Sequence, residues 1–229
     1  MLLFSSKCLY EGVGVFARDY KNLFESKGRS LTSMEIYPIL IQDGDLHEHA
    51  CTKILRVEFL RKNGLSFKEG ILGEDTEWMF RILRLNSAII LSDVQLYIYT
   101  ESREGSIVNT ASTRSVRDAI STIRSSIEYY EANPTVPTRE FELAHCSYIW
   151  SIALGLYRNV PKEDRGVIKT ELKVIKKHLN LKAHPKSRKV WILYLLLGFD
   201  ITSLILSKYI SLHKKNLVNK KKKISDNGN

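Results

Sequence analysis

Two adjacent carboxylates, Glu74 and Asp75, follow Gly73 at a point where a turn runs into a predicted helix. A carboxylate at a helix start is kept ionised by the unpaired backbone N–H groups and the helix dipole. An ionised carboxylate can accept a proton, so general-base chemistry is one interpretation of this pair. The competing interpretation is a helix cap, which is worth about 1 kcal/mol and needs no catalytic role.

A series of short motifs surrounds the two carboxylates from Lys53 to Ile107. In chain order they are Lys53-Ile54-Leu55-Arg56, Phe59-Leu60, Phe67 with Glu69-Gly70, Glu74-Asp75, Tyr97-Ile98-Tyr99, and Arg103 with Ser106-Ile107. Together they resemble the second half of bacterial family 2 glycosyltransferases, which have the GT-A fold. In the capsule, O-antigen and exopolysaccharide members of that family, the pattern reads lysine–hydrophobic–arginine, Phe-Leu, Phe-x-Glu-Gly, Glu-Asp, Tyr-x-Tyr and Arg-x-x-Ser-Ile.

This resemblance implies roles for residues on the acceptor side. Asp75 would be the general base of an inverting sugar transfer, with Glu74 shaping the acceptor pocket beside it. A sugar hydroxyl is far too weakly acidic to ionise at neutral pH, so it must lose its proton as it attacks the anomeric carbon of a nucleotide sugar. Lys53 and Trp78 are further candidates for this pocket, although Trp78 shares a helical stripe with Ile82, a pattern that favours core packing.

On the donor side, the resemblance suggests that Arg103 and Ser106 contact the diphosphate of the nucleotide sugar. The guanidinium fork suits that task, but an exposed arginine in a loop is more often simply solvated. The complete family enzyme also holds a divalent metal ion, Mg²⁺ or Mn²⁺, on an Asp-x-Asp motif. Asp43-Gly44-Asp45 is first of all a turn signal, so the metal ligands cannot be identified in this chain. We therefore expect the nucleotide-binding part of the family domain to be missing from it.

His47, His49 and Cys51 form a second, weaker candidate site, since alternating residues share one face of a strand and these side chains can bind a metal ion. Three such ligands without a fourth favour ordinary packing. The cysteines Cys8, Cys51 and Cys146 form no paired motif, which indicates a reducing compartment and no disulfide framework.

The hydrophobic periodicity predicts an α/β fold: a partial GT-A-like mixed sheet with flanking helices in residues 1–110, a helical extension in 111–182, and a basic amphipathic helix with a disordered tail in 183–229. The predicted strands are Gly12–Ala17, Ile36–Ile41, Ala88–Leu91 and Gln95–Tyr99. The predicted helices are Thr52–Lys62, Glu74–Leu85, Val116–Tyr130, one capped by Thr138 that ends near Tyr157, and one that begins at Pro161.

The net charge of +10 is concentrated at the C-terminal end, where ten basic residues stand against two acidic ones from Lys186 onward. A terminal run of lysines without interleaved aromatics is not typical of a nucleic-acid site, so we expect no nucleic-acid partner. Val190–Phe199 is apolar on every side but shorter than the roughly 20 residues needed to cross a bilayer. Its extension to Leu212 adds Asp200 and three serines on one face, a pattern that favours lying on a membrane surface through residues 186–223.

Two other interpretations of this helix stay open: packing on the protein's own core, and a true membrane span. Met1–Phe4 is too short for a secretory signal, so the expected location is the cytoplasm, peripheral on the inner face of the cell membrane. The expected partners are a nucleotide-sugar donor and a glycan or lipid-linked acceptor in cell-surface polysaccharide synthesis. The alternative function is a non-catalytic, membrane-peripheral helical module that binds a partner protein.

Overall fold

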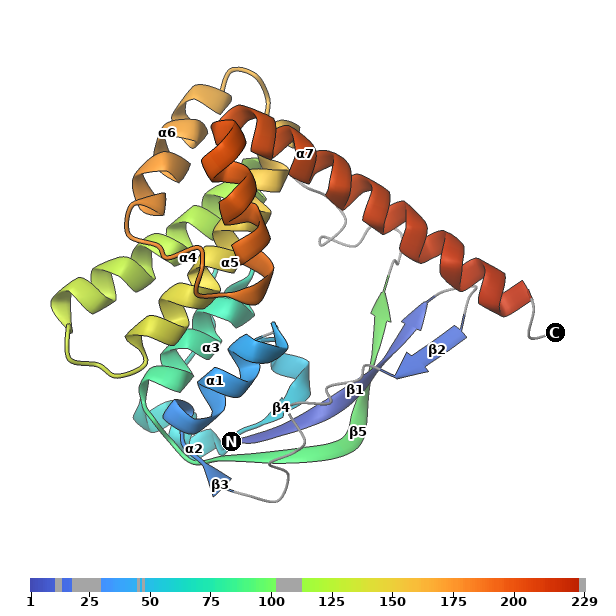
Figure 1. Ribbon diagram of the computed structural model, residues 1–229. Coiled ribbons are helices and arrows are strands. Elements are labelled where there is room, and N and C mark those ends of the chain that lie inside the picture. The colour runs from blue at the N-terminus through green and yellow to red at the C-terminus, as the bar shows by residue number, and fades with distance from the viewer. Residues whose placement is uncertain (11–13, 18–29, 45, 47, 102–112, 227–229) are drawn as a thin grey trace.

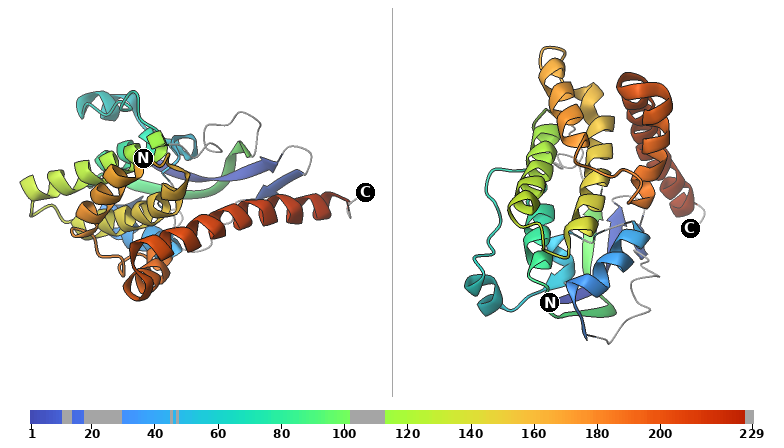
Figure 2. Two further views of the ribbon diagram at one scale, coloured as in Figure 1. Left: turned by 90° about the horizontal axis from the view of Figure 1, so that it is seen from above. Right: turned by 60° about the vertical axis from the view of Figure 1, so that its left-hand side comes forward.

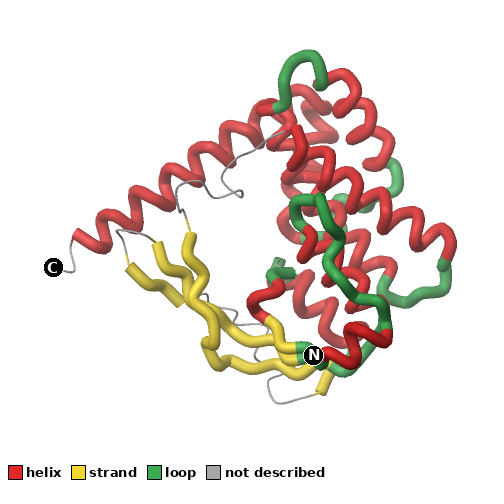
Figure 3. The backbone as a smooth tube through the Cα atoms, turned by 180° about the vertical axis from the view of Figure 1, so that it is seen from behind, coloured by secondary structure: helices red, strands yellow, loops and turns green. Residues whose placement is uncertain are grey.

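The computed structural model describes the chain except for residues 11–13, 18–29, 45, 47, 102–112 and 227–229, and it has a mixed α/β architecture, as predicted. A curled sheet lies at one end of the molecule and a group of helices at the other (Figure 1). Viewed from behind, the long C-terminal helix leaves the helical end and extends toward the outer end of the sheet (Figure 3).

The sheet is built around two long strands that run parallel, β1 (Leu2–Tyr10) and β5 (Ile89–Glu101). β2 (Gly14–Ala17) and β4 (Lys53–Ile54) pair antiparallel with β1, and β3 (Ser30–Leu31) pairs antiparallel with the start of β5. The register of β1 against β5 shifts between Phe4 and Ser6, which marks an irregularity in the ladder. The sheet therefore bends in its middle.

The strand predictions are partly confirmed. Gly14–Ala17 is a strand, β2, and the predicted strands Ala88–Leu91 and Gln95–Tyr99 are both parts of one irregular strand, β5. β1 was not predicted. The prediction of a strand at Ile36–Ile41 is wrong, because these residues lie inside helix α1 (Ser33–Asp43). A capping box explains this helix, because the Glu35 carboxylate accepts a hydrogen bond from the backbone N–H of Thr32 at 2.8 Å and so fixes the first turn.

The helical predictions fare better. The structure confirms helices close to those expected: α3 (Glu74–Arg84), α4 (Thr113–Ala132), α5 (Arg139–Leu156) and α6 (Arg165–Lys176). The helix expected from Thr52 is reduced to α2 (Val57–Lys62), because Lys53 and Ile54 pair with β1 as β4. The last helix, α7 (Pro185–Asp226), is longer than predicted and is interrupted at Gly198, whose backbone is not helical.

The main core extends from the sheet into the group of helices. α1 and α3 lie between the sheet and the more distant helices α4, α5 and α6, as the rotated views show (Figure 2). Its largest fully buried side chains include Trp150, Tyr37, Phe80, Ile36 and Met79. A smaller cluster of Leu65, Trp78 and Ile82 lies on the other side of α3, so this helix is packed on two sides.

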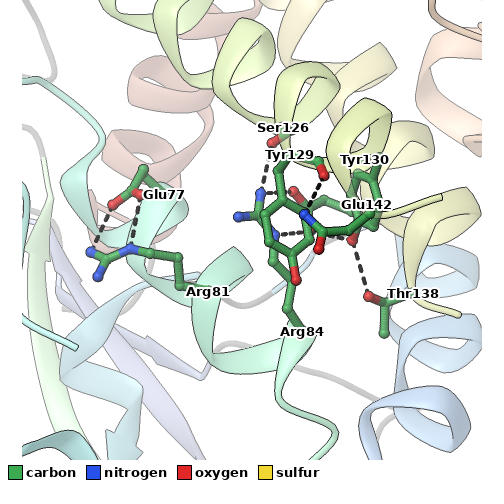
Figure 4. A network of polar contacts seen from close by, with 9 residues as sticks. Glu77, Arg81, Arg84, Ser126, Tyr129, Tyr130, Thr138 and Glu142 are labelled. Carbon is green, nitrogen blue, oxygen red and sulfur yellow. Dashed lines mark hydrogen bonds and ion pairs between the residues drawn. The ribbon is translucent and has the colours of Figure 1, made fainter. Parts of the chain in front are cut away.

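A buried ion pair joins the C-terminal end of α3 to α5. The Arg84 guanidinium donates to the fully buried Glu142 carboxylate, with Nε and Oε2 3.0 Å apart (Figure 4). The Tyr130 hydroxyl on α4 donates to the same carboxylate at 2.7 Å, and the Tyr129 ring lies 3.9 Å from the guanidinium carbon. Burial, followed by the charge of Glu142, raises the pKa of Tyr130, so this phenol stays protonated and can donate. The network thus fixes α3 against both helices.

Replacing Glu142 by Ala is expected to lower the free energy of unfolding by about 3–5 kcal/mol, because the change leaves the Arg84 charge buried without its partner. Urea unfolding followed by circular dichroism measures this loss. Glu171→Ala is the matched control: it removes the partially exposed pair with Arg124, 3.3 Å long, and should cost about 1 kcal/mol or less. Equal losses in the two variants would contradict the role given to the buried pair.

Candidate functional site

The carboxylates of the Glu74-Asp75 motif lie in the first turn of α3, after a turn that is held in place from outside. Gly73 has φ of 81°, in the left-handed region that favours glycine, and it is the residue at which the helix begins. α4 holds the preceding turn, because the Asp118 carboxylate accepts from the Leu72 N–H at 2.9 Å and Arg114 donates to the Gly70 carbonyl at 2.9 Å. The start of α3 is therefore positioned by α4.

The Asp75 carboxylate is mostly buried, with 27% of its side chain exposed. One of its oxygens accepts from the Thr76 N–H at 2.9 Å, and the other lies 3.4 Å from Nδ1 of His49. Burial alone would raise the pKa of Asp75, but the hydrogen bond and charge of His49, the Thr76 amide and the charge of Lys53 outweigh it and lower the pKa below its ordinary value of 3.8. Asp75 is therefore ionised at neutral pH.

His49 is fixed from two further directions. The Lys53 ammonium donates to the His49 carbonyl at 2.7 Å and to the Thr52 hydroxyl at 3.3 Å, which ties the segment before β4 together. The Tyr99 ring, from β5, stacks beside the His49 imidazole with 6.0 Å between ring centroids. Residues from α3, β4, β5 and the segment before β4 thus meet around one carboxylate.

The interpretation of His47, His49 and Cys51 as a metal site on a strand is not supported. Ala50–Thr52 forms a short 3-10 helix rather than a strand, so Cys51 and His49 do not share a strand face. His47 lies outside the described residues, and the residues that are described contain no group of three or more His, Cys, Asp or Glu side chains arranged for a metal ion. His49 is instead the partner of Asp75, a pairing that no spacing in the sequence indicated, because the two residues lie on separate elements.

The other acidic residues of the first turn differ from Asp75. Glu74 is exposed to solvent. Glu77 pairs with Arg81 one turn later, with contacts of 2.8 Å from both Nε and Nη2 (Figure 4), and Arg81 also donates to the Ser66 carbonyl at 2.6 Å. Glu77 therefore anchors the loop before α3, and Glu74 and Asp75 are the carboxylates of this turn that make no contact with Arg81.

Trp78 is a core residue rather than a pocket residue. Its side chain is 4% exposed, and its indole N–H donates to the Leu65 carbonyl at 3.1 Å. The Phe67 ring packs against it with 4.7 Å between centroids. The expectation of an acceptor-pocket role for Trp78 is therefore corrected in favour of the packing alternative. Lys53 is also buried, and its ammonium faces the backbone of the His49 segment.

The remaining residues that the sequence singled out lie partly outside the described residues. Arg103 and Ser106 lie outside the described residues, as does Asp45. Gly44, between Asp43 and Asp45, is the left-handed residue that ends α1, with φ of 76°, so the interpretation of this motif as a turn is confirmed.

An apolar cavity of about 460 Å³ lies beside β4 but shares no residue with the Asp75 cluster. Its walls come from the chain start, the segment around β4, α2 and the start of β5; the residues include Met1, Ile54, Arg56, Phe59 and Ile90. The lining of this cavity carries no carboxylate.

Comparison with known proteins gives no significant match to any protein-family model, curated protein or solved structure. The geometry around Asp75 and the order of the surrounding motifs are thus the grounds for a function.

Replacing His49 by Leu, a side chain of similar size without charge, is expected to raise the pKa of Asp75, since His49 supplies the largest of the effects that lower it. A carbon-detected NMR titration of the Asp75 carboxyl measures the change. In the wild type, the Asp75 charge stabilises the fold above its unfolded-state pKa, and this stabilisation is lost as the pH falls through the lower folded-state value. His178→Leu, which removes the exposed pair with Glu131, is the control and should leave the Asp75 midpoint unchanged.

Gly73→Ala is expected to destabilise the protein by about 1–2 kcal/mol, because a Cβ atom is strained at positive φ even where the space around it is open. Gly166→Ala is the matched control: Gly166 lies within α6, also with open space around it, and alanine there should stabilise the helix by about 0.5–1 kcal/mol. Thermal unfolding of both variants shows whether each change lowers or raises the stability of the protein. A stabilised Gly73→Ala variant would refute the assigned backbone conformation.

Proposed function

We propose that this chain carries the acceptor-side half of a GT-A type, family 2 glycosyltransferase that transfers a sugar with inversion from a nucleotide-sugar donor to a glycan or lipid-linked acceptor. The observation that carries the proposal is the ionised, partly exposed Asp75 carboxylate at the start of α3, paired with His49. The order of the motifs from Lys53 to Ile107 supports it independently.

In the proposed reaction, Asp75 accepts the proton of an acceptor hydroxyl as that oxygen attacks the anomeric carbon of the donor. One C–O bond forms to the acceptor while the bond to the nucleoside diphosphate breaks, and the diphosphate leaves with the electron pair. A carboxylate held ionised by His49 and the Thr76 amide has its proton-accepting oxygens ready at neutral pH. Its 27% exposure leaves room for approach by a hydroxyl group.

The divalent metal ion of the complete family enzyme would neutralise charge on the leaving diphosphate. The described residues do not supply a set of ligands for it, so no step is assigned to a metal ion. Arg103 and Ser106 remain the candidates for contact with the donor diphosphate, on the resemblance alone.

A second candidate is the non-catalytic helical module, which the exposed apolar side chains of α7 favour. The two functions differ in what they require of Asp75. A module that binds through its helices needs Asp75 only as a structural contact of α3, through Thr76 and His49, whereas the transferase needs its carboxylate to accept a proton.

Asp75→Asn is expected to lower sugar transfer by at least about a hundredfold, because an amide cannot accept the proton. Two quantities are compared between cells that carry the wild-type chain and cells that carry the variant. The first is the amount of surface polysaccharide. The second is the nucleoside diphosphate that their membranes release when supplied with a panel of nucleotide sugars. Glu163→Gln makes the same carboxylate-to-amide change at an exposed position between α5 and α6, and it should retain full transfer. Full transfer by a folded Asp75→Asn chain would favour the non-catalytic module.

A further inference from the structure

α7 consists of two helical limbs joined at Gly198, whose φ of 69° and ψ of −173° interrupt the helix. The first limb covers residues 185–197 and the second covers residues 199–226; the bend between them lies at the far side of the helical end of the molecule (Figures 1 and 3). The part from Pro185 to Leu212 is long and apolar enough to cross a bilayer, with a mean hydropathy of 1.9 in its most apolar window, of which 22% is buried.

The inner side of the second limb is attached to the protein by polar contacts. Arg158 donates to the Ser203 hydroxyl at 3.0 Å and to the Asp200 carbonyl at 2.7 Å, and the Lys169 ammonium lies 2.6 Å from the Asp200 carboxylate. Ser203 is fully buried. Of the polar face that the sequence suggested would meet solvent and lipid head groups, Ser203 is therefore turned toward the protein, whereas Asp200, with 57% of its side chain exposed, pairs with Lys169 at the edge of the contact.

Apolar contacts add to this attachment. Gly155 of α5 lies directly beneath the second limb, so close that a Cβ atom there would come within 2.5 Å of the Ile210 side chain and 3.3 Å of the Leu206 Cβ. Phe199 is buried against the Tyr157 ring, with 5.1 Å between centroids. A membrane-spanning helix would have to break these contacts and leave Arg158 without its partners. The structure therefore favours a second limb that stays packed against the other helices of the protein.

The outer side of α7 is apolar and exposed. Leu195 and Leu196, next to the bend, are 68% and 73% exposed, more than any other large apolar side chains in the described part of the chain. In the second limb, the exposed apolar residues recur at helical spacing on the side opposite Ser203 and Ile210; they are Ile201, Leu204, Ile205, Tyr209 and Leu212. We call these residues, with Leu195 and Leu196, the outer face of α7.

Basic residues lie at both ends of the outer face and also within it. Lys186, Arg188 and Lys189 are exposed at the start of the first limb, and Lys208 is exposed within the second. The sequence continues with two lysines at 214–215 and four at 220–223. A second copy of this chain would bring like charges together, whereas anionic lipid head groups are complementary to these cations.

We propose that the outer face of α7 docks on the surface of a bilayer that contains anionic lipids, with Leu195 and Leu196 entering the acyl boundary and the flanking lysines at the head groups. An apolar stripe with basic flanks is the pattern of helices that lie in the membrane interface. This docking does not depend on the catalytic role of Asp75. In combination with the proposed transferase, it would place the site at the cytoplasmic face of the membrane, where lipid-linked acceptors are found.

The test is flotation of the full chain with vesicles of phosphatidylcholine, alone or mixed with phosphatidylglycerol. Wild-type protein is expected to float with the mixed vesicles, and Leu195→Glu/Leu196→Glu to lower the apparent affinity by at least about tenfold, because charged groups replace the side chains that enter the acyl boundary. The control is Val167→Glu/Val174→Glu, which places the same charges on exposed valines of α6, on a different side of that helix from Lys169. The control should float like the wild type.

Leu195→Ser/Leu196→Ser, which adds no charge, provides a second variant if the first is unfolded by circular dichroism, and it too should lose binding. Wild-type binding by a folded leucine variant, or equal loss in the valine control, would overturn the proposal. So would protein that resists extraction from the vesicles at high pH, which indicates a span. Light scattering that shows a dimer abolished by the leucine changes, without vesicle binding, would identify a second copy as the occupant.

Discussion

The position of α3 is the constraint on which the site depends, and the buried Arg84–Glu142 pair fixes one end of that helix. At the other end, Arg114 and Asp118 of α4 hold the turn from Gly70 to Gly73 in place by hydrogen bonds. Trp78 and Ile82 pack in the small cluster, while Met79, Phe80 and Leu83 pack in the main core. The helix is thus held at both ends and on two sides, and a carboxylate in its first turn has little freedom to move relative to β4 and β5.

Helices were predictable from this sequence, and the sheet largely was not. The apolar stripes of α4 and α6 have a clear 3.6-residue period, and their ends are marked by residues such as Asn133 and Pro134. β1 has no comparable signal: Ser5, Ser6 and Lys7 interrupt its apolar residues, and its strand conformation depends on pairing with β5, which is distant in the sequence. Ile36–Ile41 has the β-branched residues typical of a strand, but the capping box at Thr32 and Glu35 begins a helix there.

The same holds for the site, where the local sequence pattern predicts some features and contacts between elements distant in the sequence determine the others. The local pattern sufficed to place Asp75 at a helix start, and it favoured packing for Trp78. The pairing of Asp75 with His49 arises only when the segment before β4 is brought beside α3, and the stacking of Tyr99 on His49 further requires β5. Residue types alone suggested metal ligation for His49, whereas its surroundings assign it to the carboxylate.

Gly198 sets the shape of α7 through a backbone conformation that is essentially restricted to glycine. Because the bend depends on one residue with no side chain, the angle between the two limbs is insensitive to the identity of the neighbouring leucines. Substitutions that keep the outer face apolar can therefore change its sequence without changing the angle between the two limbs. Conversely, any other residue at 198 would favour a straight rod, in which the second limb could not contact Arg158 and Gly155 while Tyr194 of the first limb stays packed on Trp150. The residue at position 198 therefore decides whether the second limb of α7 lies along the other helices or points away from them.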